Sequence, residues 1–248
     1  ALDPHDLPPA VGTIIVEAGA ALAPHAGRAV LVEVTSLAEA RAAVQAGAAA
    51  VIAKGTESGG RVGDETTFVL VQSLAAHLTV PVYAQGGVGL YTAAACIAGG
   101  AAGVVLDAQV ALARESTLGA EIKSALSAMD GSETALLDGY RVFSRPDLPL
   151  REIAARGVAA SLGASDLRRE LLPAGQDAAF ARPLAARFRS TGGIVRGLLA
   201  AIERSIARAR EQHALGEGAP LAARHGFRYP IMQGPMTRVS DRAAFADA

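Results

Sequence analysis

The sequence predicts an α/β fold built on a parallel sheet. Short runs rich in β-branched residues alternate with alanine-rich segments of helical character up to residue 107. The runs are apolar at nearly every position, as in parallel strands that are buried on both faces. Because consecutive parallel strands need a crossover connection, the repeated spacing of strand, helix and strand indicates right-handed βαβ units. This pattern leaves a doubly wound sheet and a closed barrel as alternatives.

Five segments have the composition of strands: residues 13–17, 29–35, 50–53, 80–84 and 103–107. The first helix starts at Ser36, which forms a capping-box pattern with Glu39, and it ends at Gly47. Mostly apolar segments predict two further helices over residues 66–77 and 90–98. Since each helix lies between two predicted strands, we expect the five strands to share one sheet.

Between residues 118 and 225 the sequence shows helix signals and no convincing strand. A helix is predicted over residues 120–129 and a longer one over residues 193–214. Apolar residues recur every four positions along the longer helix and predict one buried stripe: Ile194, Leu198, Ile202 and Ile206. Glutamates are interleaved with its arginines, which favours a solvated or interface helix over a nucleic-acid surface.

Composition and charge limit the classes of partner. The formal net charge of -1 predicts neither a nucleic-acid nor a membrane-surface partner, and no run approaches the ~20 apolar residues that cross a bilayer. Cys96 is the only cysteine, which excludes an intrachain disulfide and fits a reducing cytoplasm. The five histidines lie apart without the spacing of metal ligands, so no metal is expected.

Two glycine pairs follow successive predicted strands. Gly59 and Gly60 come after the third strand, and Gly86 and Gly87 come after the fourth. Glycine lets backbone N–H groups approach an anion closely, and a following helix adds its positive N-terminal end. The two strand-to-helix turns that contain these glycine pairs therefore predict a site for a phosphorylated cofactor. The alternative is that these glycines only shape tight turns between strand and helix.

Three motifs taken together are more specific than either glycine pair: residues 54–63, 85–89 and 229–236. They resemble the 2-nitropropane dioxygenase-like family, which covers nitronate monooxygenases and flavin-dependent enoyl reductases. Residues 57–66 are similar to such domains embedded in polyketide or polyunsaturated fatty acid synthases. The resemblance implies an oxidoreductase with a TIM barrel that binds FMN, a small-molecule or acyl-thioester substrate, and neighbouring synthase domains as partners.

The order of the motifs implies an incomplete barrel. The five predicted strands match the family's fourth to eighth strands, whereas the motif that ends the family's first strand stands near the C terminus, at Gln233, Gly234, Pro235 and Met236. We therefore expect a partial (β/α)8 TIM-type barrel over residues 1–117, a helical extension and linker over 118–228, and the first strand of a further barrel in 229–248. The alternative is a circular permutation, in which that last strand closes the first barrel.

The resemblance and the strand ends together give the expected cofactor contacts. The residues expected to bind FMN are Lys54, Gly59, Gly60, Gln85, Gly86, Gly87, Gln233, Gly234 and Met236. Lys54 is included because it stands at the carboxyl end of a predicted strand, where the chemistry of barrels is concentrated. Its alternative is a rim lysine paired with Glu57.

Two departures from the family bear on catalysis. Family nitronate monooxygenases carry a catalytic histidine directly after the first glycine pair, where this chain has Arg61. Arginine stays protonated and cannot act as that base, although it can hold an anionic substrate. Glu57 is the carboxylate available for acid/base work. Asp107 replaces a glycine next to the expected phosphate, and a carboxylate ~4 Å from a phosphate costs on the order of 1 to 4 kcal/mol.

Three hypotheses follow for the function. The first is an FMN-dependent oxidoreductase domain of a multidomain synthase, in which Arg61 orients the substrate and Glu57 moves protons. The second is a catalytically degenerate barrel that serves as a structural or docking domain, because Arg61 and Asp107 replace expected functional groups. The third is another phosphate-binding TIM-barrel enzyme.

Overall fold

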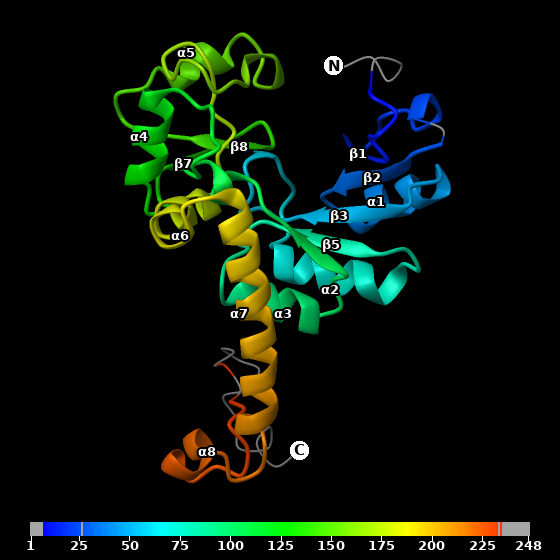
Figure 1. Ribbon diagram of the computed structural model, residues 1–248, viewed down its shortest axis with the longest axis vertical. Coiled ribbons are helices and arrows are strands. Elements are labelled where there is room, and N and C mark those ends of the chain that lie inside the picture. Colours follow the sequence, from blue (N-terminus) through cyan, green and yellow to red (C-terminus); the bar gives the residue numbers. More distant parts are fainter. Residues whose placement is uncertain (1–6, 26, 233, 235–248) are drawn as a thin grey trace, which may run out of the picture. The chain divides into compact units, whose positions relative to one another are not determined.

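The computed structural model describes residues 7–25, 27–232 and 234 (Figure 1). The chain divides into two compact units, Ala1–Glu203 and Arg204–Ala248. The domain boundaries expected after residues 117 and 228 remain predictions. In the described residues, no helix is both long and apolar enough to cross a membrane.

The first unit contains a five-stranded parallel sheet in the order β1-β2-β3-β5-β6. Its strands are β1 (Thr13–Glu17), β2 (Ala29–Val34), β3 (Ala50–Lys54), β5 (Val82–Gln85) and β6 (Gly103–Val105). All five predicted strands are confirmed, and β3 is buried along its whole length. The spatial order follows the chain without the reversal of a doubly wound sheet, as in consecutive strands of a barrel wall.

Three helices connect the strands and cover one face of this sheet: α1 (Leu37–Gln45), α2 (Thr67–His77) and α3 (Thr92–Ala98). Helices α1 and α2 pack on β3 and on each other, and α3 packs on β6. Ser36 caps α1 by accepting a hydrogen bond from the Glu39 N–H at 3.2 Å. The main core forms where fully buried side chains of these helices, such as Ala40, Leu70 and Leu74, meet those of β2 and β3. The predicted helices are confirmed.

The expectation that residues 118–225 contain no strand is wrong. Strands β7 (Thr134–Leu137) and β8 (Tyr140–Phe143) form an antiparallel hairpin, and β8 also pairs with the short strand β4 (Gly60–Arg61). Asp138 and Gly139 have φ angles of 47° and 79°. These angles fit a type I′ turn, which joins the two strands of a hairpin through a two-residue loop. This Asp-Gly pair between short apolar runs is the signal that the helical interpretation missed.

The rest of the first unit consists of helices and short turns. The α-helices are α4 (Ala120–Ala128), α5 (Leu150–Ala154), α6 (Ala181–Phe188) and α7 (Thr191–Gln212), whose residues after Glu203 belong to the second unit. The 3-10 turns are η2 (Ala23–His25), η3 (Ala108–Val110), η4 (Ala159–Ser161) and η5 (Gln176–Phe180). The predicted α4 and α7 are confirmed. Ile194 and Leu198 of the predicted stripe are buried on α7, whereas Ile202 and Ile206 are only partly buried.

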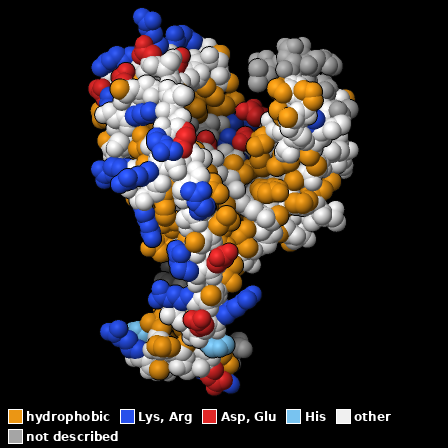
Figure 2. Space-filling view, viewed as in Figure 1, with side chains coloured by type: hydrophobic (Ala, Val, Ile, Leu, Met, Phe, Trp, Pro, Cys, Tyr) orange, Lys and Arg blue, Asp and Glu red, His pale blue; other side chains and the backbone are white. Residues whose placement is uncertain are grey.

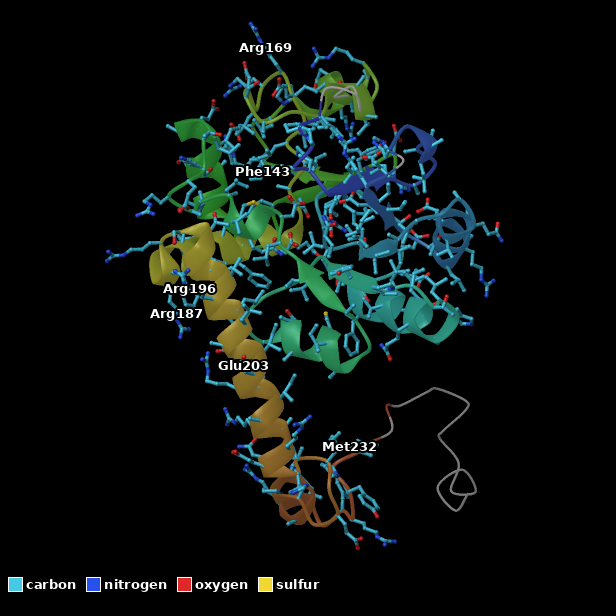
Figure 3. The ribbon with its side chains drawn as sticks, turned by 45° about the vertical axis from the view of Figure 1, so that its right-hand side comes forward. Phe143, Arg169, Arg187, Arg196, Glu203 and Met232 are labelled. Carbon is cyan, nitrogen blue, oxygen red and sulfur yellow. The ribbon has the colours of Figure 1, made fainter. Side chains whose placement is uncertain are left out.

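A second core holds the hairpin and the later helices together. It contains Ile122 and Leu126 of α4, Phe143 of β8, and Leu167 and Leu172 from the loop before η5. Phe143, labelled in Figure 3, is only 2% exposed and belongs to this core. Residues 118–203 are therefore packed into the first compact unit.

The second unit contains helix α8 (Pro220–His225), which begins with proline and ends at Gly226 in the left-handed conformation. Beside it, Arg228 forms an exposed ion pair with Glu217 at 3.0 Å. The strand expected over residues 229–236 does not form in its described part, residues 229–232 and 234. Gln233 and residues 235–248 lie outside the described residues.

Helix α2 offers a direct test of this packing. Leu70 is fully buried in the main core, whereas its neighbour Val69 is 53% exposed. We expect Leu70→Ala to lower the free energy of unfolding by about 2–5 kcal/mol, because it leaves a cavity. The matched variant Val69→Ala should change it by about 0.5 kcal/mol or less. Urea unfolding followed by circular dichroism measures both, and equal effects would contradict the assigned faces of α2.

Candidate functional site

A polar cleft of about 380 Å³ lies at the carboxyl edge of the parallel sheet. Figure 2 shows acidic and basic side chains gathered in this hollow, between the sheet and the hairpin. Every strand of the sheet contributes at or beside its carboxyl end: Glu17, Glu33, Lys54, Gln85 and Asp107. The loop at Gly59, Gly60 and Arg61 and the ring of Pro173 also line it. Side chains from successive strand ends converge at this edge, which is where α/β proteins hold their ligands.

Lys54 and Gln85 lie in the cleft as the sequence predicts. The Lys54 side chain is buried, and its Nζ donates to the Glu33 carboxylate at 3.1 Å. The expected alternative partner, Glu57, is therefore replaced by Glu33. Gln85 is 3% exposed, and its Oε1 atom has no hydrogen-bond partner among the described residues. Of these two side chains, Lys54 has an ammonium that is already paired, whereas Gln85 offers a ligand an unused hydrogen-bond acceptor.

Asp107 brings a further carboxylate into the cleft. Burial raises its pKa above the usual range, and the nearby Glu33 carboxylate raises it as well. The Lys54 ammonium and a hydrogen bond from the Gln85 side chain lower the pKa of Asp107, but they do not cancel the effect of burial. An anionic ligand would meet these carboxylates at close range.

Arg61 lines the cleft, but its guanidinium is engaged by α1. The two terminal nitrogens donate to the two carboxylate oxygens of Glu39 at 2.8 and 3.2 Å. The hydrogen bond to Glu39 raises the pKa of Arg61. Burial alone would raise the pKa of Glu39, but hydrogen bonds from Arg61 and the Thr35 N–H hold it below its usual value. The side chain expected to bind an anionic substrate already holds an internal carboxylate in two-point contact.

Glu57 caps helix α2. Its carboxylate accepts hydrogen bonds from the Thr67 N–H at 3.0 Å and from the Thr67 hydroxyl at 3.1 Å. Thr66, the residue at the N-cap position, makes no side-chain capping bond, so Glu57 supplies the missing acceptor from the preceding loop. Glu57 is not among the residues that line the cleft. Its acid/base role remains a prediction, and its observed contacts are structural.

The glycine pairs lie near each other, but protein atoms pack against them. A Cβ on Gly59 would overlap the Pro173 carbonyl, and a Cβ on Gly86 would lie 2.6 Å from the Ser58 and Thr67 hydroxyl oxygens. Gly60 has a φ of +76° and borders the cleft, where a Cβ would lie 3.7 Å from the Lys54 Nζ. Close packing within the chain therefore accounts for Gly59 and Gly86.

Asp177 is the residue that the sequence analysis missed. One oxygen of its carboxylate accepts hydrogen bonds from the Gly87 N–H at 3.3 Å and from the Gln109 side chain at 2.9 Å. Asp177 is only 2% exposed, and its other oxygen has no partner among the described residues. Burial raises the pKa of Asp177 to about 7, and the Asp107 carboxylate adds to the shift. No local motif marks this contact, since Asp177 and Gly87 are 90 positions apart.

The phosphate end of FMN does not fit this arrangement. The Gly87 N–H, expected to receive the phosphate, already faces the Asp177 carboxylate, and Asp107 is close enough to raise the pKa of Asp177. The free Oε1 of Gln85 is compatible with a polar ligand edge, so the mismatch concerns the phosphate. Of the remaining predicted contacts, Gly234 is exposed, and Gln233 and Met236 lie outside the described residues.

Comparison with known proteins identifies the family. A family model described as nitronate monooxygenase matches residues 20–158, more than half of the chain. The chain belongs to the nitronate monooxygenase family. This confirms the resemblance on which the FMN expectation rests. No curated protein matches the chain.

Solved structures of the same fold agree with this assignment. The M276A mutant of FabK from Thermotoga maritima has a TM-score of 0.71 and 28% identity, covering 82% of this chain and 70% of that one. Nitroalkane oxidase from Streptomyces ansochromogenes has a TM-score of 0.60 and 26% identity, over 75% and 61% of the two chains. The enoyl reductase domain of MlnA from the Bacillus amyloliquefaciens macrolactin cluster has a TM-score of 0.60, over 82% and 77%. At 10% identity, MlnA supports the fold alone.

Asp177 should make stability depend on pH. Its pKa is 3.8 ordinarily and about 7 in the folded protein, so between these values the folded state binds a proton that the unfolded state has released. Stability should therefore fall as the pH rises from about 4 to about 7, and this contribution should be constant above that range. Asp177→Asn should remove this slope, while the exposed Asp64→Asn should leave it unchanged. Thermal unfolding across the range measures the effect, and an unchanged slope in Asp177→Asn would contradict it.

Proposed function

We propose that this chain forms part of a nitronate monooxygenase-type barrel that has lost flavin-dependent catalysis and serves as a structural or docking domain of a multidomain synthase. The observation that carries the proposal is the two-point ion pair between Arg61 and Glu39. Arg61 stands where the family resemblance implies the catalytic histidine. A proton on the carbon next to a nitro group needs a base with a free lone pair, and a guanidinium paired to a carboxylate offers none.

The other charged side chains expected to act are also occupied within the chain. Glu57 is committed to the N-terminus of α2, and Glu33 is paired with Lys54. At the second glycine pair, where the family resemblance implies the phosphate, the Gly87 N–H donates to the Asp177 carboxylate instead of being open to a ligand. Among the described residues that line the cleft, these contacts leave no cationic side chain free to bind an anion.

The synthase setting rests on the sequence around the first glycine pair. Residues 57–66 are similar to domains embedded in polyketide or polyunsaturated fatty acid synthases. A fold shared with the MlnA enoyl reductase domain is consistent with that setting. We include in the proposal a cytoplasmic location, neighbouring synthase domains as partners, and a partial barrel in which the five strands of the parallel sheet correspond to the family's fourth to eighth strands.

A second candidate function is an active FMN-dependent oxidoreductase that acts on a small molecule or an acyl thioester. One observation favours it: the cleft combines a buried lysine, an unused acceptor on Gln85 and a carboxylate, Asp107, whose pKa is raised by burial. Ionisable groups perturbed in this way are concentrated at functional sites. Bound flavin would carry out the redox step, with these residues orienting the substrate.

Turnover by the unmodified protein separates the two candidates. We expect the full-length protein to purify without flavin absorbance, and to show neither nitronate oxidation nor enoyl-thioester reduction when FMN is added at about 100 μM, well above usual cofactor affinities. Free FMN and an active family enzyme serve as assay controls. Sustained turnover of either substrate, in proportion to protein concentration, would contradict the proposal and support the second candidate function.

A further inference from the structure

The hydrogen-bond donors near the second glycine pair, Gly86 and Gly87, bind a carboxylate of the chain itself, that of Asp177. The Gly87 N–H and the Gln109 side-chain amide converge on one oxygen of Asp177, at 3.3 and 2.9 Å. Gln109 is fully buried and is itself fixed, since its Oε1 accepts from the Asp107 N–H at 2.7 Å and its Nε2 also donates to the Val88 carbonyl at 3.2 Å. A backbone N–H after a strand and a fixed amide are the kind of donors that bind phosphate oxygens.

The position of Asp177 beside Gly87 is set by a close contact between two backbone segments, the loop after β3 and the segment before η5. The Gln176 N–H donates to the Glu57 carbonyl at 2.9 Å. A Cβ on Gly175 would overlap that carbonyl, and one on Gly59 would overlap the carbonyl of Pro173. Glycines on both sides therefore allow the loop after β3 and the segment before η5 to meet without intervening side chains. Asp177 follows directly in the chain, so the docking of these backbones fixes its side chain at Gly87.

We propose that the Asp177 carboxylate is an internal ligand that occupies the anion-binding corner at Gly86 and Gly87, so that this chain excludes the phosphate of FMN. This inference rests on the proposed loss of flavin-dependent catalysis and adds to it, beside the ion pair of Arg61 with Glu39, the residue that excludes the cofactor's phosphate. A phosphate would compete with Asp177 for the same N–H donor. It would also meet the neighbouring Asp107 and Glu57 carboxylates, both of which raise the pKa of Asp177.

Protonation of Asp177 does not open the corner. The pKa of Asp177 is about 7, so a share of the molecules carries a neutral side chain near neutral pH. The neutral carboxyl still fills the same volume, and its second oxygen remains buried. Exclusion of phosphate therefore depends on the presence of the side chain more than on its charge, and removal of the side chain is the decisive change.

The test compares FMN with riboflavin, which has the same ring and lacks the phosphate. Fluorescence titration of the unmodified full-length protein should give equal affinities for the two flavins, because the phosphate gains no contact. In Asp177→Gly, and in Asp177→Ala as a second variant, FMN should bind at least about tenfold more tightly than riboflavin. Asp64→Asn is the matched control. It removes an exposed carboxylate outside the cleft lining, keeps the Gly87 N–H bonded to Asp177, and should leave the two affinities equal.

Each result decides the inference. A preference of the unmodified protein for FMN of about tenfold or more would show that the phosphate is already accommodated and would overturn it. Equal affinities in both Asp177 variants, with the cooperative melting transition retained, would overturn it as well. Should both variants lose that transition, the comparison in the unmodified protein decides alone. Turnover by the unmodified protein without preference for FMN would contradict the proposed loss of catalysis and leave this inference standing.

Discussion

The contact between the loop after β3 and the segment before η5 is the constraint on which the site depends. The Glu57 carbonyl accepts from the Gln176 N–H, and Gly59 and Gly175 let the two backbones touch. The same loop carries Glu57 to the cap of α2 and passes into β4, which pairs with the hairpin. A residue larger than glycine at either position would separate the parallel sheet from the part of the unit that brings Asp177.

Charge in the cleft follows from this packing. Carboxylates gather at the carboxyl ends of the strands, while the cations that face them, Lys54 and Arg61, are bound to Glu33 and Glu39. Asp107, which lines the cleft, and Asp177, which contacts Gly87 and is not among the lining residues, both have raised pKa values because burial disfavours their ionised forms. The result is an acidic site on a fold whose relatives are expected to bind a phosphorylated cofactor. The family assignment accounts for the framework, whereas the charge near Gly87 depends on the Asp107 and Asp177 side chains of this chain.

Local signals explain what the sequence could predict. The buried strands are continuous apolar runs, and Lys54 and Gln85 stand at strand ends, so their place at one edge follows from parallel topology. Partners distant in sequence could not be predicted. Arg61 meets Glu39 across 22 positions, and Asp177 meets Gly87 across 90. The β7-β8 hairpin could have been predicted from the sequence, because its Asp-Gly turn is a short-range signal.

The hydrogen bond between the Gly87 N–H and the Asp177 carboxylate is the central claim, and the amide resonance of Gly87 reports on it directly. In ¹⁵N NMR spectra of the unmodified protein, the Gly87 amide shift should titrate with a midpoint at pH about 7, the pKa of Asp177. The same resonance should be independent of pH in Asp177→Asn. A Gly87 amide that does not respond to pH in the unmodified protein, or that titrates identically in Asp177→Asn, would contradict the account.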